Sequence, residues 1–319
     1  MTRTVTWTRG GRTAVVLALF AAMLCAGTAG ASVPLPKPGT PAQVAALVAA
    51  SSRIQRLPAN LLPSLSQVPA DSASTYFPVT ASGCTGVRQC VFGDTRAAST
   101  VVLLGDSHAL MWLPSLAPVA TAKHLRLVLM WKSACPAASI LVWNAAIRAP
   151  YTACSSWRAA AIAAVRRLAP SIVLLADRTT GIYDAANVLT TDAHWQAGEA
   201  ATIAALATKR TRVAVFGDIT PFSALLPECL AVYPHRVQTC SQRAPNPKIP
   251  GHFAAERAAA LSRHAAYLDP APLLCTSVCS PVIGTMAAYF DSVHVTATYA
   301  AYLSGAWSSL LVAAGLVHA

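Results

Sequence analysis

Short apolar runs alternate with helical patterns along most of this chain, and that alternation limits the folds open to it. Five runs are apolar and mostly β-branched or leucine: 101–104, 126–131, 171–176, 212–216 and 266–268. Helical patterns lie between and after them, over 109–123, 155–168, 192–209, 253–264 and 296–315. Short runs apolar on both faces are typical of parallel strands covered by helices on each side. We therefore predict a three-layer α/β/α domain with a mainly parallel, five-stranded sheet.

The first 31 residues have the parts of an export signal. Three arginines precede an apolar core over 14–25, and Ala29-Gly30-Ala31 is a cleavage site of the A-x-A type. We expect residues 1–31 to be a signal peptide, or a membrane anchor if the signal is not cleaved. No later segment has about 18 uninterrupted apolar residues, the length that a spanning helix needs. The domain is therefore expected outside the cytoplasm, secreted or associated with the cell envelope.

The segment 32–83 is rich in proline and has no strand pattern. Proline removes a backbone donor and punctuates regular structure, so we expect a linker that includes a short helix over about 41–57. The folded domain is then expected over 84–319.

The chain is basic, with 24 Lys and Arg against 12 Asp and Glu, a formal charge of +12. Removal of the signal takes away three arginines, which leaves 21 against 12, or +9. Such an excess favours an anionic envelope polymer or membrane surface, although it is also found in proteins that are simply basic. Nucleic acid is not an expected partner of an exported protein, and the sequence has no dense basic stripe.

Eight cysteines follow the signal, and they fall into four couples close in sequence. An even number of cysteines in an exported chain predicts disulfides. The expected pairs are Cys84–Cys90, Cys135–Cys154, Cys229–Cys240 and Cys275–Cys279, three of which would staple loops that follow strands. A C-x2-C spacing is absent, so we expect no zinc site, and the chemistry considered below needs no metal or cofactor.

The stretch STVVLLGDSHALMW, residues 99–112, places polar groups where a buried strand gives way to a helix. Gly105 would let the chain turn sharply, and Ser107 would lie at the helix start, where backbone N–H groups can stabilise an oxyanion. His108 could touch substrate or simply cover the helix start. Trp112 is the tryptophan best placed to stack on a sugar ring, although core packing is the commoner role.

A serine hydroxyl needs a base that a third group orients. Near the other end of the chain, Asp291 and His294 lie three residues apart in YFDSVHVTATYA. The carboxylate can hold one imidazole nitrogen and leave the other for Ser107. Thr296 is placed to cap the final helix and so to fix the histidine loop.

The GDSHA motif and the terminal D-x-x-H followed by Val-Thr resemble the SGNH (GDSL-like) hydrolase superfamily, whose fold is flavodoxin-like. WKSACPA, CSSW, RVAVFGDITPFSALLPECL and YLDPAPLLCTSVC narrow the resemblance to the extracytoplasmic SGNH domain associated with acyltransferase-3 proteins. The resemblance covers about 84–315 and implies transfer or removal of O-acyl groups, usually acetyl, on envelope glycans. It implies that Ser107 is the nucleophile, His294 the general base and Asp291 the orienting carboxylate.

Two positions depart from the superfamily pattern, which completes the oxyanion hole with a glycine and an asparagine. Here Lys132-Ser133-Ala134-Cys135 follows the second strand and Ala176-Asp177-Arg178 follows the third. The donors could be the Ser107 N–H with a backbone N–H near Ser133, or the Arg178 side chain. Arg178 could instead pair with Asp177 or Asp184.

The sequence thus favours an exported serine-dependent O-acyltransferase or esterase that acts on envelope carbohydrate through an acyl-Ser107 intermediate. Transfer would need an acyl donor, which the resemblance suggests is a separate acyltransferase-3 membrane protein. The alternative is a catalytically weak glycan-binding module of such a system, which the missing glycine and asparagine favour.

Overall fold

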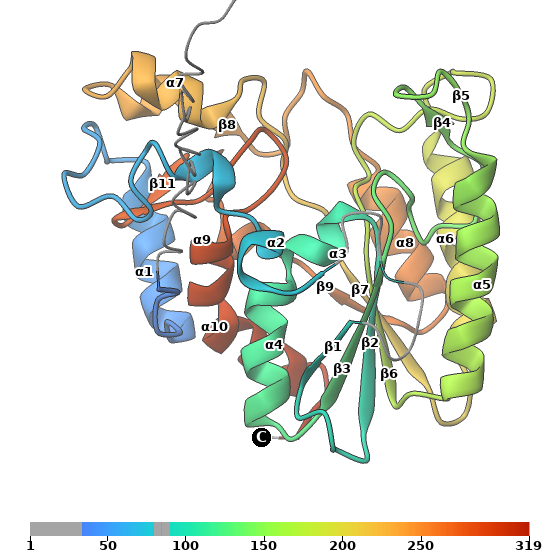
Figure 1. The fold of residues 1–319 in the computed structure, drawn as a ribbon. Coiled ribbons are helices and arrows are strands. Elements are labelled where there is room, and N and C mark those ends of the chain that lie inside the picture. Colours follow the sequence, from blue (N-terminus) through green and yellow to red (C-terminus); the bar gives the residue numbers. More distant parts are fainter. Residues whose placement is uncertain (1–33, 80–83, 85–89, 319) are drawn as a thin grey trace, which may run out of the picture. The chain divides into compact units, whose positions relative to one another are not determined.

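The computed structural model describes residues 34–79, 84 and 90–318, so the expected signal peptide lies outside the described residues. Its centre is a six-stranded sheet in the order β1-β3-β2-β6-β7-β9 (Figure 1). These strands are β1 (Val91–Gly93), β2 (Thr100–Gly105), β3 (Arg126–Trp131), β6 (Ile172–Ala176), β7 (Arg212–Phe216) and β9 (Ala266–Leu268). The five predicted strands are confirmed and run parallel, whereas β1 is an additional edge strand that pairs antiparallel with β3.

Helices cover both faces of the sheet, as predicted (Figure 1). They are α1 (Pro41–Ser51), α2 (Ala73–Tyr76), α3 (Ser107–Met111), α4 (Leu113–Ala122), α5 (Thr152–Leu168), α6 (Asp192–Leu206), α7 (Leu226–Val232), α8 (Phe253–Ser262), α9 (Ala297–Tyr302) and α10 (Ser304–Ala313). The helix expected over 109–123 is broken at Trp112, because Pro114 cannot donate a backbone hydrogen bond to the preceding turn. The last predicted helix is likewise divided, at Leu303.

Several short strands and turns lie outside the central sheet. The two-residue strands pair as β4 (Trp143–Asn144) with β5 (Ala149–Pro150), β8 (Gln242–Arg243) with β10 (Val278–Cys279), and β11 (Val282–Ile283) with β12 (Met286–Ala287). Three 3-10 turns complete the described elements: Val68–Ala70, Val237–Cys240 and Ala271–Leu273.

The sheet separates two hydrophobic cores. Along β2, Val101 and Leu103 belong to the core that α4, α9 and α10 cover, whereas Val102 and Leu104 belong to the core under α5 and α6. Alternate strand side chains point to opposite faces, so a run that is apolar at every position suits a sheet covered on both sides. Each such buried side chain contributes roughly 1.5–3 kcal/mol to folding.

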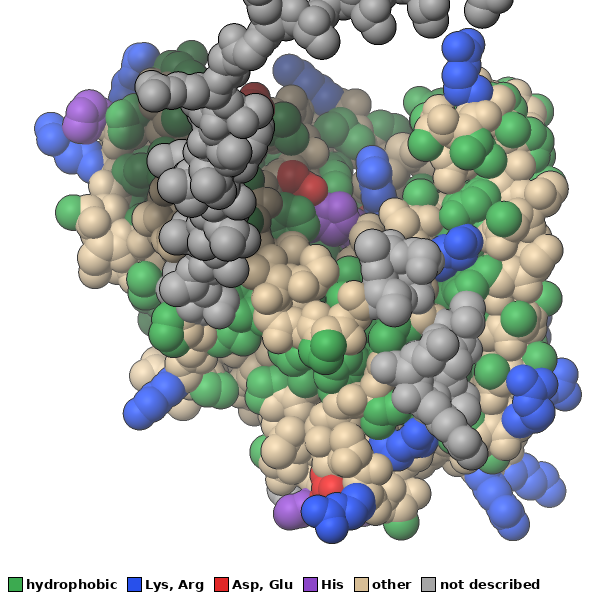
Figure 2. Space-filling model, in the orientation of Figure 1, with side chains coloured by type: hydrophobic (Ala, Val, Ile, Leu, Met, Phe, Trp, Pro, Cys, Tyr) green, Lys and Arg blue, Asp and Glu red, His purple; other side chains and the backbone are tan. Residues whose placement is uncertain are grey.

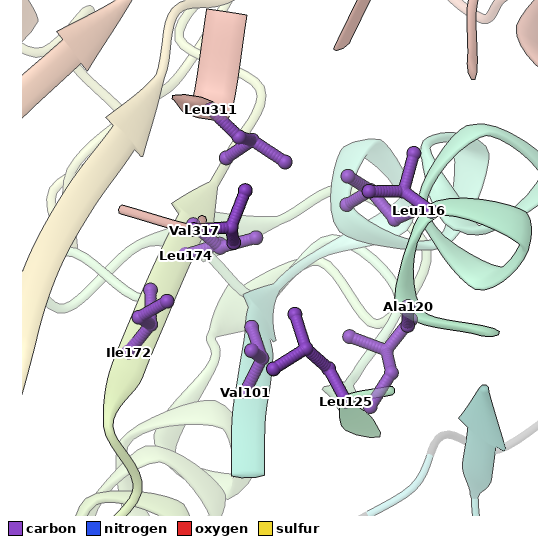
Figure 3. Close-up of a pocket in the computed structure, with 10 residues that line it drawn as sticks. Val101, Leu116, Ala120, Leu125, Ile172, Leu174, Leu311 and Val317 are labelled. Atoms are coloured by element: carbon purple, nitrogen blue, oxygen red, sulfur yellow. The ribbon is translucent and has the colours of Figure 1, made fainter. Parts of the chain in front are cut away.

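A small apolar cavity lies between the sheet and the helices α4 and α10 (Figure 3). Its volume is about 20 Å³, and Val101 and Ile172, near the amino ends of their strands, line it. A space of this size with apolar walls offers little to a polar ligand. It is a packing gap at the sheet edge opposite Ser107.

Residues 34–79 correct our expectation of a linker, because they pack onto the domain. Val44 and Val48 of α1, together with Val68, are buried in the same core as α10. Backbone bonds also tie the segment down: Leu62 N–H donates to Thr285 O at 2.8 Å. The prolines interrupt regular structure, but the apolar residues between them fill the core. The compact unit therefore includes residues 34–79 and does not begin near Cys84.

All four predicted disulfides are present, linking Cys84 to Cys90, Cys135 to Cys154, Cys229 to Cys240 and Cys275 to Cys279. Disulfides persist in oxidising compartments, so four of them indicate an extracytoplasmic domain. No helix in the described part of the chain has the length and apolar character needed to cross a membrane.

Candidate active site

Ser107 lies at the carboxyl end of β2, where the strand order of the sheet reverses. The chain passes from β2 to β3 on one side and then to β6 on the other. Ligands bind at such switch points in open α/β sheets. Asp106 caps the helix that follows, since its Oδ1 accepts the His108 N–H at 2.8 Å.

Gly105 has a role that differs from the one we predicted. Its φ is not left-handed, so the turn does not require glycine. A Cβ at this position would instead lie 2.0 Å from the carbonyl oxygen of Ala176 and 2.8 Å from Asp177 Oδ1. Glycine therefore allows β2 and β6 to approach closely just below Ser107.

The structure brings together the three residues that the sequence predicted as partners. His294 Nε2 lies 2.8 Å from Ser107 Oγ, and His294 Nδ1 lies 2.7 Å from Asp291 Oδ2. These distances fit a hydroxyl that donates to Nε2 and an Nδ1–H that donates to the carboxylate. The arrangement aims the free nitrogen of a neutral imidazole at the serine.

Several contacts fix the orientation of His294. Asp291 Oδ1 accepts the backbone N–H groups of Val293 and His294, both at 2.7 Å. The Phe290 ring is stacked on the imidazole, with centroids 5.2 Å apart and an interplanar angle of 5°. Thr296 caps α9, as predicted, because its hydroxyl oxygen accepts the Tyr299 N–H at 3.1 Å.

Electrostatics keep the Asp291 carboxylate ionised. Burial alone would raise the pKa of Asp291, but the hydrogen bond and charge of His294 and the two backbone N–H groups lower it below its ordinary value. An ionised carboxylate accepts from Nδ1–H and stabilises an imidazolium.

A second, fully buried His–Asp pair, formed by His108 and Asp218, lies beside this trio. Sequence analysis did not identify Asp218 as a site residue. His108 Nδ1 is 2.7 Å from Asp218 Oδ1, and the His108 ring centroid is 5.0 Å from that of His294. Burial disfavours the imidazolium, but Asp218 outweighs it and raises the pKa of His108. His108 is 1% exposed and thus fills the wall behind the trio instead of touching substrate. Asp218 follows β7, so its position at the sheet edge was the available signal.

A cavity of about 760 Å³ opens above Ser107 and His294. Ser133 and Arg178, both predicted as site residues, line it, and so does Trp143. Trp112 does not, because it is 1% exposed and packs against Phe216 and Trp307 in the core. In Figure 2, a hollow on this face exposes histidine and acidic side chains, with basic side chains close to them.

Further acids are buried under the sheet edge. Burial, helped by the nearby Asp106 carboxylate, raises the pKa of Asp177 to about 8. Burial also raises the pKa of Glu199 and of Glu256 well above the ordinary value. No three His, Cys, Asp or Glu side chains within 34–79, 84 and 90–318 converge in a way that could hold a metal ion.

Comparison with known proteins identifies the family. The sequence pattern described as "SGNH domain (fused to AT3 domains)" matches residues 59–309, most of the chain. The chain belongs to this SGNH family. It is thereby placed among acyl-transfer and esterase-like modules.

One solved structure shares the fold of this SGNH domain. It is the periplasmic domain of a lipopolysaccharide acetyltransferase from Salmonella ser. Paratyphi A, with a TM-score of 0.54 and 15% identity. The match covers 69% of this chain and 86% of that one. No curated protein sequence matches significantly.

The SGNH domain presents backbone donors after β3, where its superfamily pattern has a glycine that this chain lacks. Ala134 follows β3 with a left-handed φ of 53°, a conformation that glycine adopts most easily. Ala134 and Ser133 line the cavity, and the N–H groups of Ser107, Ser133 and Ala134 have no acceptor among the described residues. Because α3 has only five residues, these N–H groups matter more than a helix dipole.

Arg178 lies after β6, in the region where the superfamily pattern has an asparagine. Its backbone N–H donates to Asp106 Oδ2 at 3.1 Å, and its Nε donates to the Thr180 hydroxyl oxygen at 3.3 Å. The pairing with Asp177 or Asp184 that we considered is not formed among the described residues. The guanidinium therefore faces the cavity with donors to spare.

Proposed function

We propose that this chain is an exported O-acyltransferase or esterase that moves acetyl groups on cell-envelope carbohydrate through an acyl-Ser107 intermediate. The observation that carries the proposal is the continuous hydrogen-bonded path from Ser107 Oγ through His294 to Asp291. The acetyltransferase named in the structural comparison supports acetyl as the acyl group and envelope glycan as the acceptor.

In the first half-reaction, Ser107 Oγ attacks the acyl carbonyl carbon while His294 Nε2 takes the hydroxyl proton. The Oγ–C bond forms, the bond to the leaving oxygen breaks, and His294 passes its proton to that oxygen. The negative charge on the carbonyl oxygen is stabilised by the N–H groups of Ser107 and Ala134 or by Arg178. The imidazolium that forms in between is stabilised by Asp291.

In the second half-reaction, a sugar hydroxyl or water attacks the acyl carbon. His294 takes its proton, the Oγ–C bond breaks, and Ser107 regains a proton from His294. A sugar hydroxyl gives transfer and water gives hydrolysis. For transfer, the proposed donor is an acyltransferase-3 membrane protein that delivers acyl groups across the membrane.

The test is the intact mass of the purified chain after brief exposure to a fluorophosphonate. We expect one adduct on the native protein, mapped to Ser107 and absent from Ser107→Ala. Ser156→Ala, which changes an exposed serine on α5, is the matched control and should label like the native protein. Absence of an adduct on the folded native protein would contradict the proposal and favour the glycan-binding alternative.

A further inference from the structure

We infer that the cavity above Ser107 binds an acidic glycan, in which a carboxylate or phosphate on the sugar meets Arg148 and Arg178. This inference rests on the proposed function, since it names the class of sugar that the same site takes. Both arginines line the cavity of about 760 Å³ that opens above Ser107 and His294. Ligand sites typically have volumes of about 300–1,000 Å³, so the space suits a sugar residue with its neighbours.

The charge of the cavity wall is unbalanced. Among the described residues that line it, the only carboxylate is Asp106. Asp106 is 2% exposed, and its oxygens accept the backbone N–H groups of His108 and Arg178. Asp106 pairs with neither guanidinium, and neither arginine forms an ion pair within the described part of the chain. Two unpaired guanidinium groups in one cavity are suited to bind an anion.

Arg148 is presented by a structured hairpin. It lies in the turn between β4 and β5 with a left-handed φ of 50°. Asn144 Oδ1 stabilises this turn by accepting the N–H groups of Ala146 at 2.9 Å and Ile147 at 3.4 Å. Arg178 is likewise held, by Asp106 and Thr180. The turn thus fixes the backbone from which Arg148 projects, and the bond to Thr180 lowers the freedom that the Arg178 side chain loses on binding.

An aromatic wall completes the match to a sugar. Trp143 and Tyr183 both line the cavity. The backbone N–H of Trp143 donates to the backbone carbonyl oxygen of Tyr183 at 2.9 Å, which places the two residues side by side. Their flat faces offer apolar surface to a sugar ring, while the arginines select its charge. Neutral sugars would use the aromatic wall alone.

The experiment compares binding of matched charged and neutral sugars to the full chain by titration calorimetry. The probes are trigalacturonate against its methyl ester, and phosphopentamannose against mannopentaose. We expect at least one acid to bind about tenfold tighter than its neutral partner, and added salt to weaken only the acid. Which acid binds distinguishes a carboxylate from a phosphate.

Arg148→Gln should weaken the affinity for the preferred acidic sugar about tenfold. Its affinity for the matched neutral sugar should stay within about twofold of the native value. Arg167→Gln, which removes an exposed charge on α5, is the control and should change neither. Equal binding of acid and neutral sugar, or an unchanged preference in Arg148→Gln, would overturn the inference.

Fluorophosphonate labelling of the same preparations separates the two proposals. Labelled Ser107 without a preference for acids contradicts only the acidic-glycan inference. A preference for acids without labelling contradicts only the acyl-serine chemistry.

Discussion

At the scale of single residues, the proposed function depends on which nitrogen of His294 carries the proton. Asp291→Asn keeps an oxygen for the backbone N–H groups of Val293 and His294 but turns an amide donor toward Nδ1. Nδ1 must then accept, so Nε2 carries the proton and cannot take one from Ser107. We expect the rate of fluorophosphonate labelling to fall by about 10³–10⁴-fold.

The control for this prediction is Asp94→Asn. Asp94 pairs with His124 at 3.3 Å in another Asp–His contact, one that is more exposed and lies apart from Ser107. Labelling of Asp94→Asn should match the native protein. An Asp291→Asn protein that labels at the native rate would show that Asp291 does not orient the base.

The buried pair His108 and Asp218 is expected to contribute to stability as a unit. His108→Gln leaves a buried carboxylate without its counter-charge, which costs about 3–5 kcal/mol of the free energy of unfolding. Asp218→Asn removes the partner from the other side. The double variant should lose less than the sum of the two single losses, as measured by denaturant unfolding. Strictly additive losses would mean that the two side chains are not coupled.

At the scale of elements, the contact of β2 with β6 is the tightest point of the site. Gly105→Ala must push the Ala176 carbonyl away or distort the end of β2, because its Cβ would lie 2.0 Å from that oxygen. We expect a loss of more than about 2 kcal/mol in denaturant unfolding. Gly315→Ala, where the added Cβ meets no neighbour but φ is +65°, should cost only about 1 kcal/mol. Equal losses would mean that the close approach is unimportant.

Elements that carry their own signal were predictable from the sequence, and elements defined by distant contacts were not. The five parallel strands are apolar on both faces, so local composition identifies them. β1 has only three residues, and only its pairing with β3 makes it a strand. The segment 34–79 was misjudged because proline content signals irregular backbone but says nothing of where the apolar side chains between the prolines pack.

The candidate site shows the same division. Ser107, Asp291 and His294 lie in short motifs whose chemistry can be recognised locally. Asp218 lies in the segment RVAVFGDITPFSALLPECL, but nothing local in the sequence pairs it with His108. Trp143 lies in no recognised motif, and only the fold brings it to the cavity. Trp112 is close to Ser107 in sequence, yet the turn into α4 directs it into the core.

At the scale of the whole molecule, buried acids make stability depend on pH. The pKa of Asp177 is raised to about 8. Between the ordinary pKa of an aspartate and about pH 8, the folded state therefore keeps a proton that the unfolded chain has lost. Stability from such a group is complete below about pH 4 and is lost as pH rises toward 8. Asp218 and Asp291, whose pKa values are lowered, act oppositely and lose their contribution in acid. We expect the free energy of unfolding to be highest in mild acid and to fall, on the order of a few kcal/mol, by about pH 8.

Glu199→Gln tests the source of this dependence. The amide keeps an oxygen for the Trp195 indole N–H, which donates to Glu199 at 2.9 Å, but it cannot ionise. The fall in stability with rising pH should become shallower, as followed by denaturant unfolding across the pH range. Glu228→Gln changes an exposed carboxyl and should leave the slope unchanged. A slope that is unaltered in Glu199→Gln would place the titrating groups elsewhere.

The proposed nucleophile and its base lie 187 residues apart in the sequence. Every strand of the central sheet and the serine itself are complete by residue 268, whereas the histidine comes 26 residues later. A ribosome builds a chain from its amino end, so a growing polypeptide carries the serine long before it carries the base. A chain released before residue 294 would therefore carry the serine without the base proposed to activate it. Under the proposed function, reactivity toward an acyl donor is acquired only when synthesis has passed residue 294.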